Sequence, residues 1–173
     1  MSTDPRDALW EATFRAYYDV YYSELVANKL IARWQIVDDV TKVLVAVTAS
    51  TSAVAGWALW QQPEFKVAWT VIAGLGALLS LTHAALSVPR RLKDWVETGS
   101  HFLSLRIDLE TLRERMRLDV QFDIAHLTNE LMACRKRYAE GKAREPHDFL
   151  LTSSLENQAQ GELNISLASE IET

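Results

Sequence analysis

Two long apolar runs without charged residues lie next to each other in the middle of the chain. The first extends from Val43 to Pro63 and the second from Val67 to Val88, with three residues between them. A helix of about 20 predominantly apolar residues crosses the hydrocarbon core of a bilayer. The pattern therefore predicts an all-α membrane protein whose residues 43–88 form a two-span transmembrane helical hairpin.

Aromatic and basic residues at the ends of the runs favour the same interpretation. Tryptophan is typical of the membrane interface, and the predicted interface residues are Trp34, Trp57, Trp60, Trp69 and Trp95. Basic residues before the first run and after the second predict that both termini lie in the cytoplasm, at the bacterial inner membrane. The alternative is a helical hairpin buried in a protein complex, because hydroxyl side chains interrupt the first run.

Small and polar residues recur at helical spacing within both runs. The candidate helix-packing residues are Ala49, Ala53, Gly56, Gly76 and Ala84, and small faces of this kind let helices associate in lipid. The polar side chains form one stripe on each run: Thr48, Thr51 and Ser52, then Ser80, His83 and Ser87. These stripes either line a water-filled pore in an oligomer or form hydrogen bonds between packed helices.

The first 42 residues predict an amphipathic helix. Asp4 is a plausible N-cap and Pro5 suits the first helical position. The expected aromatic face holds Trp10, Phe14, Tyr17, Tyr18, Tyr21, Tyr22 and Leu25. This face packs against a C-terminal helix, or it lies on the inner surface of the membrane.

Residues 89–141 predict one long cytosolic helix that resembles a coiled-coil strand. Its apolar stripe holds Leu105, Leu109, Leu112, Met116, Val120, Ile124, Leu127, Leu131, Cys134 and Tyr138. The extra step of four residues between Met116 and Ile124 is a stutter in the heptad pattern, and Gly141 is the expected helix stop. Residues 142–173 are acidic and predict either a flexible tail or a segment that folds onto a partner.

Composition excludes several classes of function. The net charge of −5 argues against a nucleic-acid partner. Cys134 is the only cysteine, so the chain has no internal disulfide and no cluster of the kind that binds zinc. We find no catalytic constellation in the sequence and therefore expect neither an enzyme nor a bound cofactor or metal.

The layout resembles the SLATT family of bacterial two-transmembrane proteins, over roughly Asp7 to Gly141. The resemblance includes the aromatic pairs Tyr17-Tyr18 and Tyr21-Tyr22, the segment Ala32-Arg33-Trp34 and the exit Pro89-Arg90-Arg91. It implies a membrane effector of prokaryotic conflict systems, with a separate sensor protein as its trigger.

These observations predict an oligomeric, pore-forming or ion-conducting effector that is controlled through its cytosolic helices. Its expected partners are the lipid bilayer, further copies of the chain and a signalling protein. The alternative is a membrane-anchored scaffold or adaptor that binds a partner through the long helix and the acidic tail.

Overall fold

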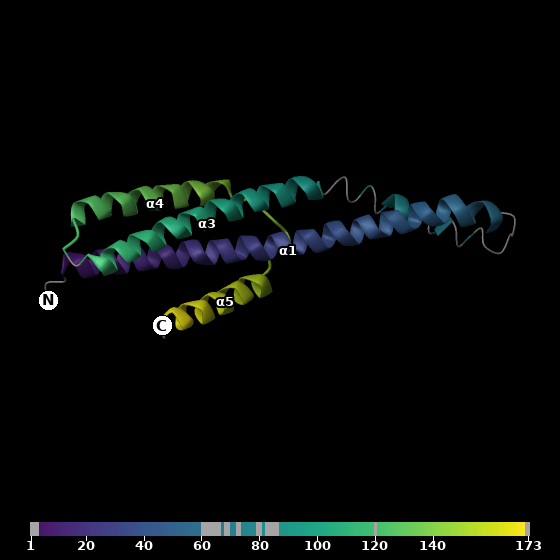
Figure 1. Cartoon of the computed structure of the whole chain (residues 1–173). Coiled ribbons are helices and arrows are strands. Elements are labelled where there is room, and N and C mark those ends of the chain that lie inside the picture. The colour runs from purple at the N-terminus through teal and green to yellow at the C-terminus, as the bar shows by residue number, and fades with distance from the viewer. Residues whose placement is uncertain are drawn as a thin grey trace. The chain divides into compact units, whose positions relative to one another are not determined.

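All the regular secondary structure in the described part of the chain is helical. The computed structural model describes residues 4–59, 67, 70, 71, 74–78, 81, 87–119 and 121–171, with the backbone alone for 47–59 and 171. Its helices are α1 (Pro5–Leu59), α3 (Val88–Leu118), α4 (Ile124–Arg144) and α5 (Ser153–Ile171) (Figure 1). The chain divides into unit 1, residues 1–31 with 94–173, and unit 2, residues 32–93.

The prediction of a transmembrane hairpin is wrong for the described residues, since none of their helices is both long enough and apolar enough to cross a bilayer. The charge-free part of α1 begins after Lys42 and ends with the helix at Leu59, and hydroxyl side chains reduce its apolar character. Most of the second predicted span lies outside the described residues, and its longest described helical stretch is residues 74–78.

In unit 1, α1 buries one face, which includes Tyr17 and Leu25 of the predicted aromatic face but not its other members. The buried positions repeat every three or four residues, as a helix packed on one side requires. They include Leu9, Thr13, Ala16, Tyr17, Val20, Ala27 and Leu30. Trp10 is 40% exposed, and Phe14, Tyr18, Tyr21 and Tyr22 are only half-buried. Tyr17 therefore lies in the core with smaller side chains, while the other aromatic residues of α1 border it.

The predicted long helix is a helical hairpin instead. The chain reverses between α3 and α4, which lie side by side and run antiparallel (Figure 1). Arg115 pairs with Glu130 at 3.2 Å, and Arg137 pairs with Asp108 at 2.5 Å. The apolar stripe thus folds back on itself, and the irregular step after Met116 marks the turn.

Aspartates define this reversal. The Asp119 carboxylate accepts a hydrogen bond from the amide of Gln121 at 2.9 Å. Asp123 is the N-cap of α4 and accepts hydrogen bonds from the amides of Ala125 and His126 at 2.9 and 3.3 Å. A capping carboxylate satisfies amides that the first helical turn leaves without a partner.

Two glycines of unit 1 permit close helix approach rather than a bend or a stop. Gly99 lies inside α3, and a Cβ there would be 3.4 Å from the Ile31 side chain. Gly141 lies inside α4, where a Cβ would be only 2.7 Å from the His101 ring. The helix stop predicted at Gly141 is wrong, because α4 continues through this residue to Arg144.

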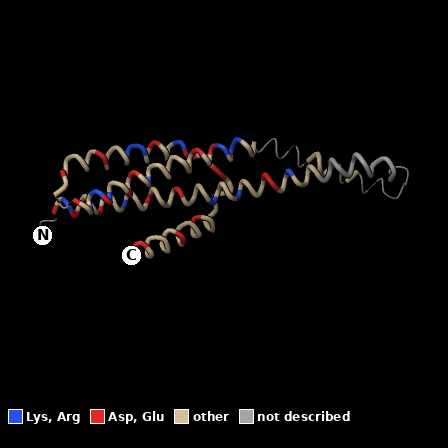
Figure 2. The backbone as a smooth tube through the Cα atoms, in the orientation of Figure 1, with Lys and Arg blue, Asp and Glu red and all other residues tan. Residues whose placement is uncertain are grey.

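The acidic C-terminal segment is not a flexible tail but contains α5. Its buried side chains follow at intervals of four residues, namely Leu155, Ala159, Leu163 and Leu167. The sequence of this helix contains acidic and no basic residues, as its colouring in Figure 2 shows. The segment folds because its one apolar stripe packs on the rest of unit 1.

Candidate interaction surfaces

Several large apolar side chains are exposed among the described residues of unit 2. Between residues 67 and 81 they are Val67, Val71, Leu75, Leu78 and Leu81, which follow at intervals of three or four residues. Exposure of these five ranges from 55% to 73%. In the same unit, α1 exposes Ile36, Val40, Val43 and Leu44. Apolar exposure of this extent marks a site of interaction with a protein or a lipid.

Charged groups of unit 2 gather at the start of α3. Arg90 and Lys93 are exposed. The Arg91 guanidinium lies 5.6 Å from the centre of the Trp34 ring, which is a cation–π distance. Lys42 pairs with Asp38 at 2.5 Å, and this carboxylate raises the pKa of the lysine. The start of α3 is therefore a basic surface.

The predicted polar stripes are not assembled among the described residues. Thr48, Thr51 and Ser52 lie on α1, where only the backbone is described, while Ser80 and His83 lie outside the described residues. Ser87 is exposed in a turn with a φ of 48°. Its carbonyl accepts hydrogen bonds from the amides of Arg90 and Arg91 at 2.9 and 3.1 Å. Ser87 therefore initiates α3 and does not extend a helical stripe.

The predicted small-residue face is similarly incomplete. The side chains of Ala49 and Ala53 are not described, Gly56 is known by its backbone alone, and Ala84 lies outside the described residues. Gly76 is buried. The packing role of these residues stays a prediction.

Two of the predicted interface tryptophans lie in the interior. Trp34 and Trp95 are both fully buried, and the Trp95 indole donates a hydrogen bond to the buried Asp148 carboxylate at 2.7 Å. Trp60 and Trp69 lie outside the described residues, as does the side chain of Trp57. Trp95 therefore anchors the segment between α4 and α5 rather than a membrane interface.

A cluster centred on Arg113 joins α1, α3 and α5. The Arg113 guanidinium lies 4.4 Å from the Tyr17 ring centre and 5.5 Å from that of Phe14. It also lies 3.4 Å from the Glu170 carboxylate, to which the Tyr17 hydroxyl donates at 3.0 Å. Burial of the phenol and the neighbouring Glu170 carboxylate together raise the pKa of Tyr17 to about 12. Tyr17 therefore acts as a neutral hydrogen-bond donor that holds the end of α5.

A second polar pair lies inside the contact between α1 and α3. Arg106 Nε lies 2.7 Å from Glu24 Oε2, but the two groups are not aligned for a hydrogen bond. The contact is therefore an ion pair. The Arg106 guanidinium also lies 4.5 Å from the Tyr21 ring centre. Burial raises the pKa of Glu24, and Arg106 opposes that rise. This pair fixes the register of α1 on α3.

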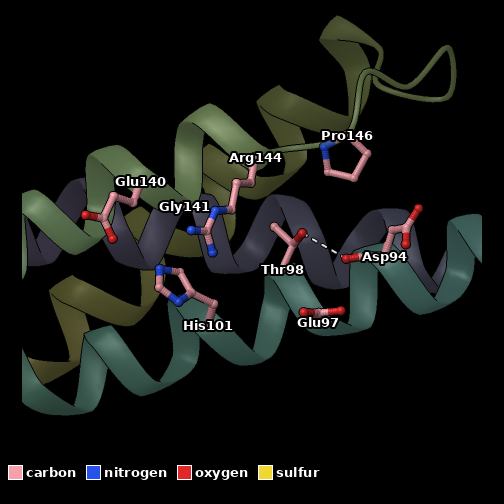
Figure 3. A pocket seen from close by; sticks show the side chains of 8 residues that line it. All are labelled: Asp94, Glu97, Thr98, His101, Glu140, Gly141, Arg144 and Pro146. Atoms are coloured by element: carbon pink, nitrogen blue, oxygen red, sulfur yellow. Dashed lines mark hydrogen bonds between the residues drawn. The ribbon is translucent and has the colours of Figure 1, made fainter.

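A groove of about 460 Å³ opens between α3 and α4 of unit 1 (Figure 3). Its wall includes the carboxylates of Asp94, Glu97 and Glu140. The Thr98 hydroxyl donates to the Asp94 carbonyl at 2.8 Å, so it is not presented as a nucleophile. His101 Nε2 lies 3.1 Å from the Arg137 carbonyl, which commits the imidazole to helix packing. Among the described residues, no group of three potential ligands is placed to hold a metal ion.

Comparisons with known proteins found no match for the chain among protein-family models, curated proteins or solved structures. The arguments about function therefore rest on the surfaces of the two units. Sequence reasoning missed Glu24, Asp148 and the buried face of α5, since their burial depends on tertiary packing. The apolar residues of α5 at intervals of four residues, Leu155, Ala159, Leu163 and Leu167, were the one available signal.

Proposed function

We propose that the protein is a helical scaffold that binds a lipid surface through unit 2 and presents unit 1 for assembly. The carrying observation is the exposure of five large apolar side chains of this unit, Val67, Val71, Leu75, Leu78 and Leu81. A lipid partner would bury these side chains without requiring the chain to cross the bilayer. Interfacial binding strengthens with the apolar area buried and with attraction to anionic headgroups.

The basic residues favour lipid over another apolar partner. Arg90 and Lys93 follow the apolar segment and are exposed. A basic residue near an anionic membrane surface contributes about 1 kcal/mol to binding. Along the sequence, the apolar side chains come before the basic ones. On a membrane surface the apolar side chains would contact acyl chains and the basic side chains would contact headgroups.

Vesicle flotation tests this proposal. The full chain is mixed with vesicles of phosphatidylethanolamine and phosphatidylglycerol and centrifuged through a density gradient. We expect the protein to float with the vesicles. Replacement of Leu75 and Leu78 by serine should weaken binding by more than tenfold, because each leucine contributes about 1.5 to 3 kcal/mol when it is fully buried.

The matched control is Ile165→Ser, because Ile165 is an apolar side chain of unit 1 that is 74% exposed. This variant should float as the unmodified chain does. The proposal fails if the unmodified chain does not float, or if the Leu75 and Leu78 variant floats as well as the control.

The pore-forming or ion-conducting effector stays a prediction, as does the resemblance to the SLATT family. Release of a trapped dye from the same vesicles is the direct measurement of a pore. Lipid binding without dye release would leave the scaffold as the function of the chain.

A further inference from the structure

We propose that α5 exchanges between two copies of the chain, so that each copy's α5 occupies the groove formed by α1 and α3 of the other. This inference concerns unit 1 alone and does not depend on lipid binding. In the reciprocal dimer, the contacts that α5 makes within one chain are made between chains. Exchange of an identical element costs little contact energy for this reason.

The surface under α5 specifies its occupant in detail. Four side chains of α5 enter it, Leu155, Ala159, Leu163 and Leu167. Lys29 of α1 pairs with Glu162 at 2.6 Å, and Arg113 of α3 pairs with Glu170 at 3.4 Å. The groove thus fits an acidic helix with an apolar residue at every fourth position. Among the described helices, α5 of a second copy meets this requirement fully.

The helix itself has little intrinsic stability. Gly161 lies in its middle, where a Cβ would meet no atom within 4 Å, so packing does not require a glycine there. Glycine in a helix is less favourable than alanine by about 1 kcal/mol. Serine and asparagine occupy several further positions of α5, and both compete with helical hydrogen bonding. Most of the helicity of α5 therefore depends on contact with a groove, which a second copy of the chain provides as well as its own chain does.

The connection to α5 has a fixed point followed by a short hinge. Asp148 is held by the Trp95 indole at 2.7 Å. Between it and the start of α5 at Ser153 lies a non-helical segment in which Phe149 is 60% exposed and Leu151 is 36% exposed. In an exchanged dimer the path of the chain changes within this segment, while Asp148 stays on Trp95.

Reversing the Lys29–Glu162 pair provides a selective test. One full-length chain carries Glu162→Lys and a second carries Lys29→Glu. Each chain alone has like charges at this contact, both when closed and in a dimer with itself. Reciprocal exchange between the two chains restores opposite charges at both contacts. We therefore expect a mixed dimer that forms at least tenfold more tightly than either chain pairs with itself.

The molar mass of each chain and of their equimolar mixture is measured by light scattering. The concentration should be about 100 µM, because the chain's own α5 competes for the groove at an effective concentration near millimolar. The chain with both substitutions restores opposite charges at this contact and should have the same molar mass as the unmodified chain. A second control mixture carries Glu11→Lys and Arg15→Glu, since that exposed pair lies within one helix and cannot exchange. This control mixture should also have the molar mass of the unmodified chain.

A mixture of the Glu162 and Lys29 chains whose molar mass is no higher than that of either chain alone overturns the proposal, and so does a control mixture whose molar mass exceeds that of the unmodified chain. Amide hydrogen exchange of the unmodified chain provides a test that requires no substitution. The amides of α5 should exchange at least tenfold faster than buried amides of α3, through opening of α5 alone. Equal exchange in α5 and α3 would overturn the proposal, even if the substituted chains fail to fold.

Discussion

Two glycines in the helices of unit 1 are expected to respond in opposite ways to the same substitution. Gly141→Ala places a methyl group 2.7 Å from His101 Cδ2 and 3.2 Å from Phe102 Cε1. Gly161→Ala places a methyl group in open space. The two variants therefore separate the effect of helix propensity from the effect of packing.

The magnitudes follow from these environments. Both variants gain about 1 kcal/mol of helix propensity. At position 161 nothing opposes this gain, so the free energy of unfolding should rise by about 1 kcal/mol. At position 141 overpacking costs about 1 to 3 kcal/mol. Displacement of His101 also breaks its contact with the Arg137 carbonyl, a loss of about 1 kcal/mol. The net loss at position 141 should be about 1 to 3 kcal/mol.

Urea unfolding followed by circular dichroism measures both changes. The two variants should differ in unfolding free energy by about 2 to 4 kcal/mol, with the unmodified chain between them. If Gly141→Ala is as stable as the unmodified chain, the close approach of α3 and α4 is incorrect. If Gly161→Ala is destabilising, the outer face of α5 is not open.

Four further substitutions or measurements test other contacts. Glu24→Gln should cost about 2 to 4 kcal/mol of unfolding free energy, since it leaves the Arg106 guanidinium without its buried partner; a loss below about 0.5 kcal/mol would contradict the buried pair. Asp123→Ala removes the N-cap of α4 and should cost about 1 kcal/mol in the same assay, with no change expected if the cap is absent. The pKa of Tyr17 is about 12 in the folded chain against 10.0 ordinarily, so the unfolded state loses its proton first as the pH rises. Stability should therefore fall between pH 10 and pH 12 by about 2 to 3 kcal/mol, and Tyr17→Phe should remove that part of the pH dependence. Cys134 is buried and burial raises the pKa of its thiol, so alkylation by iodoacetamide should be at least tenfold slower than in the urea-unfolded chain, and equal rates would place the thiol at the surface.

The start of α1 and the apolar stripe of the α3–α4 hairpin could be predicted from the sequence. The Asp4 carboxylate accepts a hydrogen bond from the amide of Arg6 at 2.9 Å, as expected of the proposed N-cap. The stripe positions Leu105, Leu109 and Leu131 are all buried. Capping and helical spacing are local properties, so single-sequence reasoning has access to them.

The reversal after α3 was missed because the segment has neither glycine nor proline. The apolar spacing is nearly continuous through it, so a stutter in one helix and a turn between two helices predict the same pattern. Asp119 and Asp123 were the available signal, since aspartate favours turns and helix N-caps.

The fold of α5 and the interior position of Trp95 depend on tertiary contacts. Low helix propensity and high polarity predict a flexible segment for residues 153–171 when that segment is considered alone. A tryptophan near a long apolar run favours a membrane interface in the same way. The Asp148 partner of Trp95 is 53 residues distant in sequence, so no local pattern reveals it.

The central claim is that unit 2 binds a lipid surface through its exposed apolar side chains between Val67 and Leu81. An environment-sensitive fluorophore tests this claim most directly. Replacement of Cys134 by serine allows a single cysteine to be introduced and labelled at position 75, or at position 165 as the exposed position of unit 1. On addition of phosphatidylglycerol-containing vesicles, we expect a blue shift and stronger emission from position 75 and no change from position 165. An unchanged spectrum at position 75, or equal shifts at both positions, would contradict the account.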